Sequence, residues 1–193
     1  MRRVALLALG VALAVSACGG ADEETATQPR VAERVEASGL VFRRADGSRI
    51  DFPGRVVAWC GPWNYEEIPA RALHIAAIEG VERSGQQWFS YWRVWAIVED
   101  VHGGKPVRFP NRFVWNKPRG AEIFVGDFPT ENETSTKQEQ SSGQIVFEDT
   151  TCELDGRVEF TLDVVVGSEF GDREPIVGKG SFSGVVSEPP AGY

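Results

Sequence analysis

Cys60 stands in the stretch VVAWCGPWN, residues 56–64, where its thiol could take part in redox chemistry. A dithiol redox site has two cysteines separated by two residues: the first thiolate attacks the substrate disulfide and the second resolves the mixed disulfide. In this chain Trp63 occupies the place of the second cysteine. The motif lacks its resolving thiol, so a thiol oxidoreductase is the third and weakest of our functional hypotheses.

The four residues Trp59 to Pro62 resemble the start of the thioredoxin active-site motif. In that family a long helix begins at the cysteine, whereas Gly61 and Pro62 would break a helix here. Phe128-Pro129-Thr130 matches the cis-proline tripeptide of the family only superficially, because a polar loop is expected after it. We interpret WCGP as the end of a core strand, with Gly61 and Pro62 turning the chain outward toward Trp63.

Other combinations of reactive side chains lack a supporting pattern. His74 and His102 lie in different segments, so a zinc or copper site would need carboxylates to converge on both. No Gly-x-Ser-x-Gly sequence is present to expose a serine nucleophile. The acidic stretch SEFGDREP, residues 168–175, lacks the regular spacing of calcium loops and is expected to be a solvated hairpin turn. We predict a protein that is not an enzyme and has no metal or cofactor.

The six tryptophans are an excess for a chain of this length. Exposed tryptophans stack against sugar rings, and inside a barrel they can line a ligand cavity. Trp63, Trp88 and Trp115 are the candidate ligand-binding residues. The alternative is that most of the six are core residues, since Trp92 and Trp95 lie on opposite faces of one apolar strand. Binding of a glycan or a small hydrophobic ligand is our second hypothesis.

The amino terminus, MRRVALLALGVALAVSACGG, has two arginines followed by 14 apolar or small residues, Val4–Ala17. This run is shorter than the ~20 residues of a membrane-spanning helix and is typical of a secretory signal. Its end, Val15-Ser16-Ala17-Cys18, resembles the lipobox of bacterial lipoproteins. The resemblance implies cleavage before Cys18, a diacylglyceryl group on its thiol and an acylated amino terminus. Gly19 in place of aspartate implies sorting to the outer membrane.

The lipoprotein resemblance also bears on the other two cysteines. If Cys18 carries lipid, Cys60 and Cys152 remain as an even pair in an exported protein, where disulfides persist. The resemblance therefore implies a Cys60–Cys152 disulfide, with two free buried thiols as the alternative. For a span of 92 residues the chain-entropy model gives a stabilisation on the order of 4–5 kcal/mol.

Three parts are expected along the chain: a signal peptide over residues 1–17, a lipidated cysteine with a flexible tether over 18–37, and one β-rich domain over 38–193. The tether is too polar to bury much apolar surface. Without the signal peptide the chain keeps 18 basic and 28 acidic residues, a net charge of −10. Such a chain is a poor candidate for nucleic-acid binding. The expected partners are the membrane, through the lipid, and an envelope protein or glycan; the oligomeric state stays open.

Apolar residues in the domain alternate with period two, as in strands. Val158, Phe160, Leu162, Val164 and Val166 share one face of the segment Gly156–Val166, and the other face is polar. Further strands are expected at Arg55–Cys60, Trp88–Glu99, Arg112–Asn116, Glu122–Asp127, Gln144–Asp149 and Ile176–Val186, and in two arms joined by a type I′ turn at Asp46-Gly47. Residues 71–78 fit either a helix or a strand, and we favour the strand.

About ten strands and little helix predict an all-β fold, an antiparallel β-sandwich with a β-barrel as the alternative. The segment Trp88–Glu99 is apolar on both faces, so it should lie centrally and be covered on both sides. The segment Thr130–Ser142 contains no aromatic or aliphatic residue and is expected to form one long surface loop. The leading hypothesis is a lipid-anchored envelope protein with a non-enzymatic binding, adhesion or structural role.

Overall fold

The computed structural model describes residues 39–52, 55–62, 71–78, 90–111, 119–171 and 173–190, which all belong to the unit formed by residues 32–193. In these residues the chain forms ten strands: β1(Val41–Arg43), β2(Arg55–Pro62), β3(Arg71–Ile78), β4(Tyr91–Ile97), β5(Pro106–Arg108), β6(Ala121–Asp127), β7(Asn132–Ser135), β8(Ser142–Asp149), β9(Arg157–Ser168) and β10(Ile176–Ser187). Two single-turn 3-10 helices, η1(Val98–Asp100) and η2(Phe128–Thr130), follow β4 and β6. The all-β prediction is confirmed.

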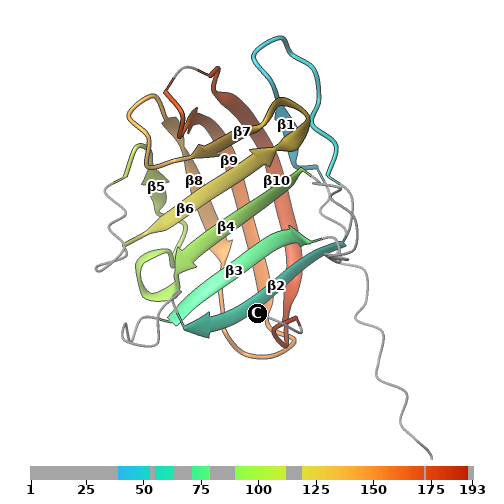
Figure 1. The fold of residues 1–193 in the computed structure, drawn as a ribbon. Helices are drawn as coiled ribbons and strands as arrows, with labels where there is room; N and C mark the ends of the chain where they lie inside the picture. The colour runs from blue at the N-terminus through green and yellow to red at the C-terminus, as the bar shows by residue number, and fades with distance from the viewer. Residues whose placement is uncertain are drawn as a thin grey trace, which may run out of the picture. The chain divides into compact units, whose positions relative to one another are not determined.

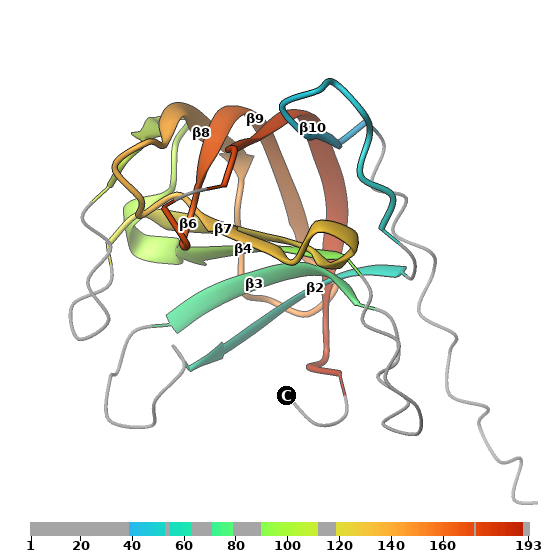
Figure 2. The ribbon, with the colours of Figure 1, turned by 45° about the horizontal axis from the view of Figure 1, so that its top comes forward.

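The strands form two layers that face each other across the core (Figure 2). The front layer has the order β2-β3-β4-β6-β7, and the back layer has the order β1-β10-β9-β8-β5. The strands of the two layers cross at a steep angle, as the diagonal β3, β4 and β6 and the upright β8, β9 and β10 show in Figure 1. The predicted sandwich is therefore confirmed.

The two long strands of the back layer also pair with the edges of the front layer. The end of β9 pairs with β7 through Thr134↔Ser168 and Ser135↔Gly167. The end of β10 pairs with β2 through Val186↔Ala58 and Ser187↔Trp59, in parallel orientation, whereas the other strand pairs of the described residues are antiparallel. The paired strands thus make a ring that is flattened into two layers, which leaves few strand edges unpaired.

Alternation of side chains fills the space between the layers. Leu73, Ile75, Trp92, Val94 and Ile123 enter the core from the front layer, and each is no more than 3% exposed. From the back layer the rings of Phe147, Phe160 and Phe182 pack side by side across three strands, with centroids 5.5 Å and 5.2 Å apart. The polar face predicted for Gly156–Val166 is also confirmed, because Arg157, Thr161 and Asp163 are exposed on β9.

Most of the predicted strands are present. The ambiguous segment 71–78 is the strand β3, and β2, β6, β8, β9 and β10 overlap the ranges that the alternation indicates. The segment Trp88–Glu99 contains β4, which lies centrally in the front layer and is buried on both faces, as expected. The strand predicted at Arg112–Asn116 lies outside the described residues. No helix in the described ranges is long and apolar enough to span a bilayer.

The hairpin near the start of the domain differs in detail from the prediction. Only Gly47 has a positive φ, of 83°, so the turn is not type I′, which requires positive φ at Asp46 as well. The amide of Gly47 donates to the carbonyl of Arg44, and the Asp46 carboxylate accepts from the amide of Ser48. The second arm is reduced to a single bridge between Arg43 and Arg49.

The prediction of a surface loop at Thr130–Ser142 is wrong. Residues 132–135 form β7, which closes the ring between β6 and β9, and Thr134, Ser135 and Thr136 are at most 1% exposed. Their hydroxyls satisfy buried groups of neighbouring strands: Thr134 Oγ1 donates to the carbonyl of Val125 at 2.9 Å. A strand without aliphatic residues can be buried because its backbone and hydroxyl hydrogen bonds are all made internally.

Candidate functional site

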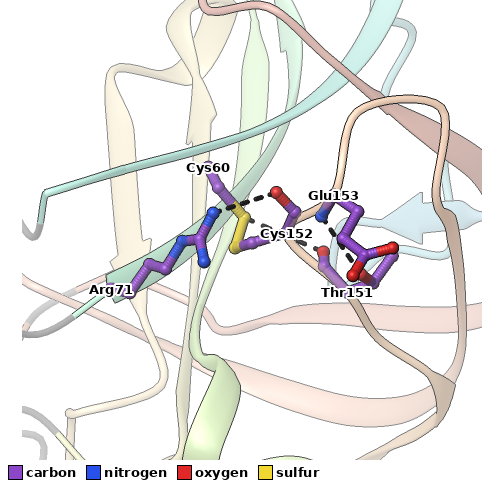
Figure 3. The surroundings of a disulfide bond; sticks show 5 residues. All are labelled: Cys60, Arg71, Thr151, Cys152 and Glu153. Atoms are coloured by element: carbon purple, nitrogen blue, oxygen red, sulfur yellow. Dashed lines mark hydrogen bonds between the residues drawn. A yellow bond between two sulfur atoms is a disulfide. The ribbon is translucent and has the colours of Figure 1, made fainter.

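The predicted disulfide between Cys60 and Cys152 is present (Figure 3). Cys60 lies on β2 in the front layer, and Cys152 lies in the connection between β8 and β9 of the back layer. Their Cα atoms are 5.5 Å apart, within the range that a disulfide requires. The guanidinium of Arg71 donates to the carbonyl of Cys152 at 3.1 Å. The bridge therefore joins the two layers covalently, across 92 residues of sequence.

The WCGP stretch does not end its strand as predicted. Gly61 and Pro62 continue β2 and pair with Ala72 and Arg71 of β3, so they do not turn the chain outward. Pro62 is at the strand end, where the lost amide hydrogen bond is tolerated. Cys60 thus sits inside an extended strand and is bonded to a distant cysteine, which is the environment of a structural disulfide.

Several predicted site residues lie outside the part of the chain that the structure describes. They are the lipidation residue Cys18 and the ligand-binding candidates Trp63, Trp88 and Trp115. The described tryptophans are buried: Trp59 is 3%, Trp92 is 3% and Trp95 is 6% exposed. Trp92 belongs to the core between the layers, whereas Trp59 and Trp95 lie on the outer face of the front layer.

On this outer face the register of four strands aligns a row of aromatic and ionisable residues. Trp59, His74, Trp95 and Glu122 are successive cross-strand partners on β2, β3, β4 and β6. The His74 ring stacks on the Trp59 ring at 5.1 Å and meets the edge of the Trp95 ring at 6.2 Å. Residues directly opposite each other on one face of a sheet interact most strongly, so this row is a continuous unit.

A second row runs beside the first on the same face. Arg93 of β4 pairs with Phe124 of β6, and Phe124 pairs with Ser135 of β7. The guanidinium of Arg93 lies 5.3 Å from the centre of the Trp95 ring, and the ring of Phe124 lies 4.9 Å from that of Trp95. Cation–π and edge-to-face contacts therefore tie the two rows together.

His74 is held in its neutral form. Burial, the largest cause, and the positive charge of Arg93 together lower its pKa to about 4. A hydrogen bond to the backbone carbonyl of Pro62 acts in the opposite direction but is the weaker effect. A neutral imidazole between two indole rings is suited to packing, and it keeps the face uncharged at this point.

Glu122 is the buried acid at the end of the first row, and its side chain is 0% exposed. Its Oε1 atom accepts a hydrogen bond from Ser135 Oγ at 2.7 Å and lies 2.8 Å from Lys137 Nζ. The other oxygen, Oε2, has no hydrogen-bond partner among the described residues. Burial raises the pKa of Glu122 to about 7, although Lys137 and Ser135 both favour the ionised form.

Lys137 and Ser135 belong to the segment for which the sequence predicted only a surface loop. Lys137 lies with its ammonium 5.2 Å from the centre of the Phe124 ring and is 19% exposed. Sequence reasoning therefore missed this half of the cluster. The available signal was Glu122 itself, the charged residue within the otherwise apolar run AEIFVG, which indicates a buried partner of opposite charge.

Among the described residues, the two histidines and the acidic turn do not form a common site. His74 is on β3, and His102 is exposed in the connection between η1 and β5. Within the described ranges, no three histidine, cysteine or acidic side chains come together as metal ligands would. Glu169 and Glu174 of the acidic turn are exposed. In the part of the chain that the structure describes, Glu122 is the buried acid whose pKa is raised, and Ser135 and Lys137 are its partners.

Comparisons of this chain with known protein families, with curated proteins and with solved structures find no match.

Proposed function

We propose that this chain is an exported lipoprotein of the bacterial cell envelope, held by lipid on Cys18, whose β domain has a non-enzymatic binding, adhesion or structural role. The observation that carries the proposal is the Cys60–Cys152 disulfide. Disulfides persist in oxidising compartments outside the cytoplasm, which is where a chain with a signal of this kind would be delivered.

The proposed anchor agrees with simple energetics. One acyl chain binds a membrane only reversibly, so the two or three chains of a lipoprotein are needed for stable anchoring. The acidic domain would be repelled mildly by anionic headgroups, and the polar tether of residues 18–37 would let it stand away from the bilayer. Gly19 supports the outer membrane as the destination.

The absence of a resolving thiol at Trp63 and the use of Cys60 in an interlayer bridge favour a structural role for this cysteine pair. If the bridge is structural, the native mature domain has no titratable thiol and does not reduce a model disulfide. Measurable insulin reductase activity of the wild type, lost in Cys60→Ser, would instead favour the oxidoreductase hypothesis.

Glycan or hydrophobic ligand binding is the alternative role, and it would have to use Trp63, Trp88 or Trp115, because Trp59, Trp92 and Trp95 are buried. A shift of tryptophan fluorescence on titration with sugars or lipids, abolished by alanine at these three positions, would favour this role over a structural one.

Fractionation tests the anchor directly. Cys18→Ser should move the protein from the membrane fraction to the soluble fraction and abolish labelling by a fatty-acid analogue. The matched control is the double variant Cys60→Ser/Cys152→Ser, which should lose the disulfide but keep the lipid label. If Cys18→Ser stays in the membrane fraction, the lipoprotein proposal is wrong.

A further inference from the structure

Residues 136–141, here named the crossover, connect β7 of the front layer to β8 of the back layer. They contain only polar residues, yet they are bonded closely to both layers. Thr136 exchanges two hydrogen bonds with Ile123 of β6, through its amide and its hydroxyl, each at 3.0 Å. Ser141 Oγ accepts from the amide of Gly167 on β9 at 2.9 Å. The crossover therefore depends on hydrogen bonds instead of apolar burial.

Gly167 shows how closely the crossover approaches β9. A Cβ atom at this position would lie 2.8 Å from Cβ of Gln138 and 3.1 Å from Ser141 Oγ, so only glycine leaves the space. Because few apolar groups hold this contact, its opening should require less free energy than unfolding of the core.

Glu122 is the buried acid that contacts the crossover, through Lys137. Its carboxyl is 0% exposed, one oxygen is shared by Ser135 and Lys137, and the other has no partner among the described residues. An ionised carboxylate in such a place lacks part of the solvation that water would provide. Movement of the crossover away from β6 would return this solvation.

We propose that Glu122 makes the crossover a pH-sensitive latch, which stays closed while the carboxyl carries a proton and opens more readily once the carboxyl is ionised. The closed state prefers the protonated acid because it excludes water, and the open state prefers the carboxylate because it hydrates it. Proton release and opening are therefore linked, and rising pH favours the open crossover.

The other charged groups around Glu122 set the strength of this link. Lys137, at the start of the crossover, stabilises the carboxylate, whereas Glu169, just after β9, opposes its ionisation. Glu133 of β7, Arg93 of β4 and His74 of β3 lie on the same outer face. Since His74 is neutral, the positive groups of this set are Lys137 of the crossover and Arg93 of β4.

The size of the effect follows from the two ionisation states. With a pKa of about 7 in the closed state and an ordinary glutamate pKa in the open state, the opening constant should rise roughly twentyfold between pH 5.5 and 7.5. Above this range the constant should level off, since the carboxyl is then ionised in both states.

Native-state hydrogen exchange, followed by NMR and corrected for the chemical exchange rate, tests the latch. The amides of Ile123, Thr136 and Gly167 should exchange through local opening. Their opening constants should rise roughly twentyfold between pH 5.5 and 7.5. In Glu122→Gln the rise should disappear. The matched control Glu159→Gln changes an acid on the outer face of the back layer and should keep the rise. The Gly47 amide, in the remote hairpin, should show no rise in any variant.

Three outcomes would overturn the latch. The crossover amides could show no pH dependence in the wild type, or they could keep it in Glu122→Gln. They could also exchange only together with the amides of the β9–β10 pairing, which would mean that no local opening exists. If Glu122→Gln does not fold, a carbon-13 titration of the wild-type carboxyl decides instead, and a midpoint below about 5 excludes the latch.

Discussion

Two lysine–carboxylate pairs of nearly equal length lie on the outer faces of the two layers. In front, Lys137 Nζ is 2.8 Å from Glu122 Oε1; at the back, Lys179 Nζ is 2.9 Å from Asp163 Oδ2. The front side chains are 19% and 0% exposed, whereas those at the back are 74% and 66% exposed. The distance between the charged atoms therefore does not predict how much such a pair affects stability. Exposure to water decides whether ionisation of the acid is linked to folding.

The residues around the front pair are also less exposed to solvent than those around the back pair. The front pair continues a row of buried aromatic rings from Trp59 to Trp95. At the back, residues of the same outer face are exposed, such as Thr161 and Val177, and Ser183 Oγ donates to the Glu159 carboxylate at 2.9 Å. The back layer thus has one dry and one wet face, whereas the central strands of the front layer are dry on both.

The largest expected effect is loss of an aromatic ring from the front row. Trp95→Ala should lower the free energy of unfolding by about 3–5 kcal/mol, because it removes a buried indole that contacts His74, Phe124 and Arg93. Thr161→Ala, on the exposed face of β9, should change it by less than about 0.5 kcal/mol. Urea denaturation of both variants measures the contrast, and equal losses would show that the two faces do not differ.

The second prediction concerns pH. The folded pKa of Glu122 is raised to about 7, so its contribution to stability is present at low pH and falls by about 2–3 kcal/mol between pH 5 and 8. Glu122→Gln should lack this fall. Relative to the wild type, the variant should therefore gain stability as the pH rises. A constant difference between the two urea profiles would contradict the raised pKa.

His74 acts in the opposite direction in the same experiment. Its pKa is lowered to about 4, so its contribution is present above the ordinary histidine pKa and is lost as pH falls toward 4. In the wild type the two groups oppose each other between about pH 4.5 and 6.5. Glu122→Gln should therefore expose a steeper loss of stability in acid.

The third prediction removes the cation of the front pair. Lys137→Met should cost about 2 kcal/mol at pH 8, because the buried carboxylate loses a charged hydrogen-bond partner. The cost should be smaller at pH 5.5, where the carboxyl can be protonated. Urea denaturation at the two pH values measures the difference, and an equal cost at both would mean that Lys137 acts only by packing on Phe124.

The smallest effect is expected for the back pair. Lys179→Met should leave the urea midpoint close to that of the wild type, and its small effect should vanish at high salt because both side chains are exposed. The effect of Lys137→Met should persist in the same salt series. A salt-independent loss for Lys179→Met would remove the distinction between the two pairs.

The strands of this fold could be predicted from alternation wherever one face is apolar. The segments that became β8, β9 and β10 show this pattern, and β9 has the polar and apolar faces that the sequence indicates. Alternation does not identify which partner covers a second apolar face. The burial of Trp95 and Ile97 was expected, but the sequence does not predict that Trp95 pairs with Glu122 on the outer face of the front layer.

The polar segment that became β7 and the crossover could not be predicted from its composition. Its hydrogen bonds are made to Ile123 and Val125 on β6 and to Gly167 on β9. Composition does not show which other strands will supply such partners. For the candidate site, none of Glu122, Ser135 and Lys137 was predicted. The charge of Glu122 within an apolar run was a usable signal, whereas nothing marked its two partners.

By itself the sequence determined the all-β class, the faces of the alternating strands and, through the lipoprotein resemblance, the expected pairing of Cys60 with Cys152. The class and the faces follow from local patterns, since side-chain alternation acts over a few neighbours, whereas the pairing follows from the two cysteines that remain once Cys18 carries lipid. Only the tertiary structure decided that Thr134 to Thr136 are buried and that Glu122 is beneath Lys137. Burial of polar groups depends on which backbone and side-chain partners the other strands bring, and this is a property of the assembled layers.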